Sequence, residues 1–419
     1  MAPSQAGYAP SLDKLLKSLK NHPLEASIDA LIFLLTRRQV HGDDCAIATA
    51  HILLQVVARS KWNDVDQLLA RVQKAGSRLV YAAPDEPVIG NIVRRVLGLI
   101  RDEASEERNA DDLSESASDI QTLTTSSSPP PRPPPLVRST TAGGSMSVSK
   151  SMFNLLSVAD PADLPTGAST PVSQAQPASI QALRSEVIDG IEEIMDEISQ
   201  ADDQIASFAE IQINPGDYVL VYRPSKTVEK FLVKAASKRR FTVFIAGLEP
   251  HKKQGAEAPY AALRKKLNAA GVNTVNLASN GLTAYMARVS KVVISAKAVY
   301  QNGGLLVDSG SCIAVQAAEA YSKPVIVLCG VYKFCPQDPS EELSWGGVKG
   351  NSSAEVSYAE GAEVDELEVE NTVTDYVRPE HVDIYLTNLG PQTLHHFAGI
   401  LADHYKPEEM LLSLQLGEA

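Results

Sequence analysis

Aromatic side chains and positive charges are scarce in this sequence. Phe, Trp and Tyr make up 5% of the 419 residues, and 38 Lys and Arg residues stand against 51 Asp and Glu residues, for a formal net charge of −13. A protein that coats nucleic acid needs a basic face and rings on which bases stack. The composition argues against that class, and we expect no direct nucleic-acid partner.

Cysteines and long apolar runs are also few. The cysteines Cys45, Cys312, Cys329 and Cys335 lack zinc-ligand spacing, and the histidines lack it too. We therefore expect reduced thiols, no metal and no cofactor. No stretch of about eighteen residues is apolar throughout, and the first residues lack the cationic and apolar pattern of a secretory signal. These absences predict a cytoplasmic protein of the cytosol with no membrane partner.

The composition changes along the chain in a way that predicts separate domains. Apolar residues recur at helical spacing in 1–103, which predicts an N-terminal helical domain. Residues 104–179 are rich in Ser and Pro, and they predict a disordered linker with a stiff run at 129–135. This run resembles a ligand of proline-binding modules, but a passive linker is the simpler interpretation. Residues 180–210 predict a long amphipathic helix that completes the helical domain.

The remaining residues, 211–419, alternate between short apolar runs and helical patterns. Such alternation predicts a parallel sheet covered on both faces, so the fold class is a helical domain plus a Rossmann-like α/β domain with a doubly wound sheet. Strands are expected at 218–222, 241–246, 272–277, 292–295, 325–329 and 381–387. Helices are expected at 228–237, 260–270, 284–288, 313–321 and 394–405.

Ligands of such a sheet bind at the carboxyl ends of its strands. Ser225 and Lys226 follow the first strand, where Ser225 is a candidate helix cap and the helix N-terminus a candidate anion site. Gly303 and Gly304 form a second candidate anion-binding loop, although Asn-Gly is a turn signal in itself. Neither G-x-G-x-x-G nor a P-loop motif occurs in the chain, so nucleotide binding is unsupported.

Several segments resemble the beta-subunit family of eukaryotic translation initiation factor 2B. The resemblance covers both expected domains and skips the linker. The similar segments are VIGNIVRRVL at 88–97, LRSEVIDGI at 183–191, KTVEKFL at 226–232, NGGL at 302–305, YKFCP at 332–336, DYVRPE at 375–380, TNLG at 387–390 and HYKP at 404–407.

This resemblance implies a fold and a set of partners. The fold is related to sugar-phosphate isomerases, and the function is that of a non-catalytic regulatory subunit. The factor exchanges GDP for GTP on translation initiation factor 2 and senses phosphorylation of the alpha subunit of that factor. Expected partners are the alpha, gamma, delta and epsilon subunits, delta most directly, and initiation factor 2. Catalysis of exchange belongs to the epsilon subunit.

The isomerase relatives allow a comparison of reactive groups. Their cysteine follows the first strand, where this chain has Tyr222, Arg223 and Ser225. Their acid-base aspartate corresponds to Lys297, and their Asn-Lys pair to Val307-Asp308. An isomerisation that moves a proton needs the thiol and the carboxylate as reactive groups, and this chain has neither at these positions. We therefore expect no catalytic residues.

Two interpretations of the inherited cleft remain open. An active sugar-phosphate isomerase is one alternative, and an allosteric subunit that binds a sugar phosphate is another. Lys297 and Asp308 lie close in sequence and can form an ion pair. In the helical domain, Arg94 and Arg95 are candidates for docking the alpha subunit of initiation factor 2, unless they belong to a salt-bridged helix face.

Overall fold

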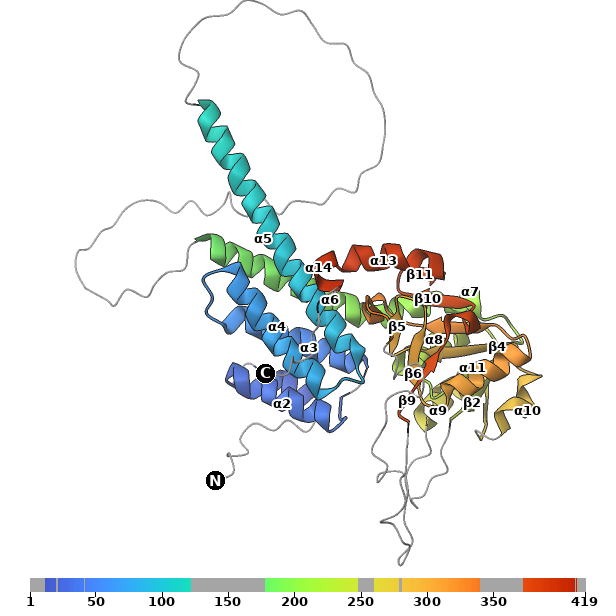
Figure 1. Cartoon of the computed structure of the whole chain (residues 1–419). Coiled ribbons are helices and arrows are strands. Elements are labelled where there is room, and N and C mark those ends of the chain that lie inside the picture. Colours follow the sequence, from blue (N-terminus) through green and yellow to red (C-terminus); the bar gives the residue numbers. More distant parts are fainter. Residues whose placement is uncertain are drawn as a thin grey trace, which may run out of the picture. The chain divides into compact units, whose positions relative to one another are not determined.

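The computed structural model describes residues 12–19, 22–40, 42–121, 178–247, 260–278, 281–339, 372–410 and 412 (Figure 1). The chain divides into two compact units, Met1–Glu107 with Ala178–Ala419, and Arg108–Pro177. The helical domain and the sheet domain both belong to the first unit. The proline-rich run at 129–135 lies outside the described residues.

Helices alone build the N-terminal part of the described chain. They are α1 (Leu12–Ser18), α2 (Leu24–Thr36), α3 (Asp43–Arg59), α4 (Val65–Ala82), α5 (Pro87–Gln121) and α6 (Ala178–Ser207). Their buried apolar residues form one continuous core. The long helix α6 packs on this core through Leu183, Val187 and Ile191. The apolar stripe of this segment is thus the face that packs on the core.

Helix α5 extends beyond the expected end of the helical domain at 103 and continues to Gln121. The expected linker at 104–179 lies close to the second compact unit, Arg108–Pro177, and its first residues continue α5. The reason is local, because residues 102–121 contain no Pro or Gly and several Glu and Ala residues, which favour helix. Serine and acidic residues alone do not end a helix.

The C-terminal part contains a doubly wound sheet, which confirms the predicted fold class. Among the described residues, seven strands lie in the order β11-β10-β7-β4-β1-β2-β3. Their pairs are parallel except for the antiparallel pair of β10 with β11. The strands are β1 (Tyr218–Tyr222), β2 (Thr242–Ala246), β3 (Asn273–Asn276), β4 (Lys291–Ser295), β7 (Val325–Leu328), β10 (Ile384–Thr387) and β11 (Gly390–Gln392).

Helices cover both faces of this sheet. They are α7 (Ala209–Gln212), α8 (Lys226–Ala236), α9 (Ala261–Ala269), α10 (Leu282–Met286), α11 (Ser311–Ala320), α13 (Phe397–His404) and α14 (Pro407–Met410), with single turns η2 (Val331–Lys333), η4 (Pro379–His381) and η5 (Leu394–His396). Strand β1 shows why both faces must be covered. Val219 and Val221 enter the core under α8 and α9, whereas Leu220 and Tyr222 enter the core under α10 and α11. Figure 1 labels these helices beside the sheet.

A second sheet was not expected from the sequence. Its order is β8-β5-β6-β9 within the described residues, and its strands are β5 (Ala298–Tyr300), β6 (Leu305–Asp308), β8 (Phe334–Cys335) and β9 (Thr374–Val377). These strands are short, and β9 pairs with a strand far away in the sequence. Periodicity within one segment cannot reveal such a pairing.

Candidate functional site

The strand order places a candidate site between β1 and β4. From β1 the chain first adds β2 and β3 on one side, and β4 then pairs with β1 on the opposite side, so the direction of strand addition reverses between β1 and β4. The carboxyl ends of two such strands form the crevice in which ligands of doubly wound sheets bind. A cavity of about 440 Å³ opens here, lined by Ser225, Lys226, Lys297 and Asp308. The structure thus brings together four of the residues that the sequence analysis selected.

The other wall of this cavity belongs to the helical domain. Asp43 and Asp44 lie in the first turn of α3, and Glu86 directly precedes α5. None of these carboxylates was predicted as a site residue. The sequence carries no signal for them, because they meet the sheet domain only after the chain folds.

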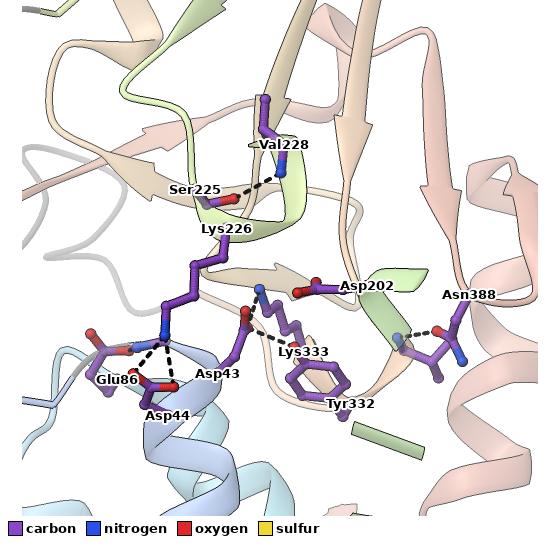
Figure 2. A network of polar contacts seen from close by, with 12 residues as sticks. Asp43, Asp44, Glu86, Asp202, Ser225, Lys226, Val228, Tyr332, Lys333 and Asn388 are labelled. Carbon is purple, nitrogen blue, oxygen red and sulfur yellow. Dashed lines mark hydrogen bonds and ion pairs between the residues drawn. The ribbon is translucent and has the colours of Figure 1, made fainter. Parts of the chain in front are cut away.

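The deepest contact between the two walls is an ion pair at η2. Lys333 Nζ lies 2.7 Å from Asp43 Oδ1, and Tyr332 Oη donates a 2.6 Å hydrogen bond to the same oxygen (Figure 2). The Lys333 side chain is 5% exposed. Burial alone would raise the pKa of Asp43, but the Lys333 ammonium and the hydrogen bonds from Lys333 and Tyr332 outweigh it and lower that pKa. This carboxylate is therefore held in its charged form.

Two further lysines of the sheet domain reach carboxylates of the helical domain. Lys226 Nζ lies 2.9 Å from Asp44 Oδ2, and the hydrogen bond to Asp44 raises the pKa of Lys226. Lys297 Nζ lies 3.7 Å from Glu86 Oε1 and 3.4 Å from Asp308 Oδ1. The predicted pairing of Lys297 with Asp308 is thus confirmed. Each lysine of the cleft already has a negative partner inside the chain.

Tyr222 fills the crevice at the end of β1. Its ring lies between Gly247, which follows β2, and Gly310, which precedes α11. Both glycines have positive φ, of +78° and +88°, and a Cβ atom at Gly247 would lie 3.0 Å from Tyr222 Cζ. Glycine is required at both positions by conformation and by space. Arg223 follows with a φ of 41°, so the backbone directly after β1 is strained.

The two candidate anion sites have internal partners. Ser225 Oγ accepts a 3.4 Å hydrogen bond from the Val228 amide, so Ser225 caps α8 (Figure 2). Gly303 and Gly304 form the turn between β5 and β6 and do not line the cavity. The Gly303 amide donates to the Tyr300 carbonyl, and the Gly304 amide donates to Asn302 Oδ1. The expected anion-binding loop is therefore a hairpin turn whose amides are already used.

A carboxylate of the chain occupies the N-terminus of α11. Asp375 Oδ2, from β9, accepts hydrogen bonds of 2.7 Å from the Gly310 amide and 3.3 Å from the Cys312 amide. Exposed amides and the helix dipole make such an end attractive to anions. Here Asp375 takes the place that a bound anion would have. The sequence analysis did not predict this role, although the segment DYVRPE at 375–380 is one of those that resemble the beta-subunit family.

Asp375→Asn is expected to lower the free energy of unfolding by about 1 kcal/mol, because the amide loses the charge that offsets the helix dipole and half of the acceptor capacity. Urea unfolding of both chains measures the difference. Asp383→Asn offers a comparison, since Asp383 accepts from the Val325 amide at the start of a strand and not of a helix. An unchanged stability of the Asp375 variant would contradict the capping role.

Arg94 and Arg95 are not placed for docking. Arg94 is 5% exposed, and its guanidinium donates to the carbonyl of Leu412. Arg95 forms a 2.5 Å ion pair with Glu197 on α6. The docking hypothesis is corrected, because both side chains hold the helical domain together. The alternative of a salt-bridged helix face describes Arg95 better, and Arg94 ties the C-terminal segment to α5.

Metal ligands and membrane spans were sought over the part of the chain that the structure describes. No cluster of three His, Cys, Asp or Glu side chains there has a geometry suited to a metal ion. In the same residues, no helix combines the length and the apolar character needed to cross a bilayer.

A helical domain joined to a doubly wound sheet, with a cleft between them, defines the structural class of this protein. The model of the Initiation factor 2 subunit family matches residues 39–393, and the chain belongs to this family. The resemblance to initiation factor 2B that the sequence showed is thereby confirmed.

Individual relatives agree with the family match. The translation initiation factor eIF2B subunit beta of Schizosaccharomyces pombe is 33% identical over 92% of this chain and 97% of its own length. The crystal structure of eIF2B beta from Chaetomium thermophilum is 60% identical, with a TM-score of 0.72 over 97% of this chain and 100% of that one. A chain of the tetrameric eIF2B-beta2-delta2 complex from C. thermophilum is 56% identical, with a TM-score of 0.70 over 94% and 100%.

Proposed function

We propose that the chain is a regulatory subunit of an initiation factor 2B complex, of the beta type, and that it assembles with a delta-type subunit. One observation carries this proposal: the chain matches, along nearly its whole length, a chain of the tetrameric eIF2B-beta2-delta2 complex. Alpha, gamma and epsilon subunits complete the proposed assembly. Its substrate is initiation factor 2, on which GDP is replaced by GTP in the cytosol.

We further propose that the chain itself catalyses no reaction. After the first strand, where the isomerases carry their cysteine, the stretch from Tyr222 to Ser225 contains none, and Lys297 stands where their acid-base aspartate would stand. The Lys297 ammonium is paired with Glu86 and Asp308, so it is not a free acid or base. This leaves assembly, and the sensing of phosphorylated initiation factor 2 during the stress response, as the proposed role of the subunit.

Co-expression with a delta-type subunit is expected to give a stable complex whose mass, measured by native mass spectrometry, equals two copies of each chain. The reason is that obligate subunits bury a large apolar interface only together. The chain expressed alone is expected to be poorly soluble.

The control is co-expression with an unrelated soluble protein, which should give no complex. A well-behaved monomer that ignores the delta-type chain would contradict the assembly. Conversion of ribose 1,5-bisphosphate by the isolated chain, abolished by Lys297→Met, would contradict the absence of catalysis.

A further inference from the structure

The edge of the sheet domain formed by α8, α9 and β3 is strongly basic. Residues 230–247 and 260–278, which contain most of these elements, include no Asp or Glu, although the whole chain has a net charge of −13. Their bases are Lys230, Lys234, Lys238, Arg239, Arg240, Arg264, Lys265 and Lys266. We call these bases together with β3 the basic edge. A surface of one sign on a protein of the opposite sign favours oppositely charged partners.

Ion pairs within the chain neutralise only part of this charge. Lys230 pairs with Asp202 and Asp203 of α6, and Lys238 pairs with Glu210 of α7. Within the described residues, no acid lies at ion-pair distance from the other bases of the basic edge. Their charge is therefore available to a partner.

Strand β3 is an open edge beside these bases. It pairs with β2 on one side and ends the sheet on the other. Asn273, Val275 and Asn276 are exposed. The strand contains no charge, proline or bulge, which commonly protect an edge from further pairing, and only its length of four residues limits that pairing.

The backbone groups that β3 turns outward follow from its register. The Leu277 amide, directly after the strand, donates to the Ile245 carbonyl of β2. Because backbone direction alternates along a strand, the amide of Val275 also points to β2, whereas those of Thr274 and Asn276 point away from the sheet. The N–H and C=O groups of these two residues can pair with an added strand.

A hollow at one end of this edge adds two guanidinium groups. It has a volume of about 660 Å³ and lies at the amino ends of β1, β2 and β3, opposite to the cleft at their carboxyl ends. The Arg240 guanidinium donates to the carbonyl of Ala270 beside the hollow. Arg288 Cζ lies 5.8 Å from the centroid of the Tyr218 ring, which lines the hollow.

This surface fits an extended acidic peptide better than a nucleic acid. A peptide strand uses the outward N–H and C=O groups of β3, and its carboxylates face the bases. A nucleic acid leaves those backbone groups unused and needs free rings on which its bases stack. The ring that lines the hollow, Tyr218, already stacks on Phe244 and contacts Arg288.

We propose that the basic edge binds an extended acidic segment of a partner protein by strand addition to β3. The backbone of the segment pairs with Thr274 and Asn276, and its carboxylates contact Lys265, Lys266 and Arg240. The proposal follows from the charge and the open strand of this edge, and it does not rest on the proposed function.

The test uses the full-length chain and a fluorescent peptide of about eight residues that alternates glutamate and threonine. Anisotropy at low ionic strength should show saturable binding, and the bound peptide should slow amide hydrogen exchange at β3. Lys265→Gln/Lys266→Gln, which neutralises two exposed bases of α9, should weaken binding by roughly tenfold. The matched control, Arg71→Gln/Lys74→Gln on the exposed face of α4, should bind as the wild type does.

A second comparison tests the backbone pairing. Asn276→Pro removes one outward amide hydrogen and keeps the pairing of β3 with β2, so it should weaken binding by roughly tenfold at an unchanged circular dichroism spectrum. The same peptide with alternate amides N-methylated cannot add as a strand and should not bind. If the proline variant does not fold, the methylated peptide carries this comparison.

Several results would overturn the proposal. Equal binding by the wild type and the Lys265→Gln/Lys266→Gln variant, or binding of the methylated peptide, would show attraction without strand addition. Slower exchange at β3 with oligouridylate and not with the peptide would make the partner a nucleic acid. Binding that tightens about tenfold in Glu366→Gln/Glu368→Gln/Glu370→Gln, whose positions lie outside the described residues, would make an acidic segment of this chain the occupant.

Discussion

Replacement of Lys333 by methionine is expected to lower the free energy of unfolding by about 3–5 kcal/mol. The ammonium is the charged partner of Asp43, and the second contact of that carboxylate oxygen is the Tyr332 hydroxyl. A methionine fills much of the space of the lysine but leaves the carboxylate without a countercharge in a poorly hydrated place. Urea unfolding, followed by circular dichroism, measures the loss.

Two further variants make the Lys333 prediction specific. Lys238→Met removes an exposed lysine that pairs with Glu210, and exposed pairs of this kind contribute about 0–1 kcal/mol. Asp43→Asn/Lys333→Met removes both charges and should be more stable than Lys333→Met alone, because no uncompensated charge remains. A Lys333 variant that loses no more stability than the Lys238 variant would show that the buried pair is unimportant.

The second large effect is expected at Tyr332. Tyr332→Ala should lower the free energy of unfolding by about 3–5 kcal/mol, because it opens a cavity in a core to which both domains contribute. The side chain is 2% exposed and lies among the apolar residues of the helical domain. The same urea titration should also become less cooperative, since the two domains lose one of the contacts that couple their unfolding.

Tyr332→Phe separates the ring from the hydroxyl. It keeps the packing and removes only the hydrogen bond to Asp43, so the loss should be about 1.5–3 kcal/mol. If the phenylalanine and alanine variants were equally destabilised, the hydrogen bond to Asp43 and not the packing of the ring would account for the contribution of Tyr332.

Local features of the site were predictable from the sequence. Ser225 caps the next helix because the hydroxyl of a serine before a helical pattern accepts a hydrogen bond from an amide two or three residues ahead. Lys297 pairs with Asp308 because Lys297 directly precedes β5 and Asp308 ends β6, and these two strands pair antiparallel. The apolar runs identified the central strands of the sheet, since a strand buried on both faces has few polar positions.

Other features depend on residues that are distant in the sequence. The Asn302-Gly303-Gly304 segment was a sound turn signal, but only the pairing of β6 with β9 shows that the turn lies in a second sheet. Arg94 and Arg95 looked like a surface pair until their partners, Leu412 and Glu197, were placed beside them. A charge has no fixed role until its neighbours are known.

The sequence by itself determined the order of helical and sheet regions and the family, because each depends on residue types and on spacing within a segment. Only the tertiary structure decided that Asp43, Asp44 and Glu86 neutralise the lysines of the cleft and that Tyr332 enters the core of the other domain. These contacts join segments that are far apart in the chain, and the distance between two charges or two rings exists only after folding.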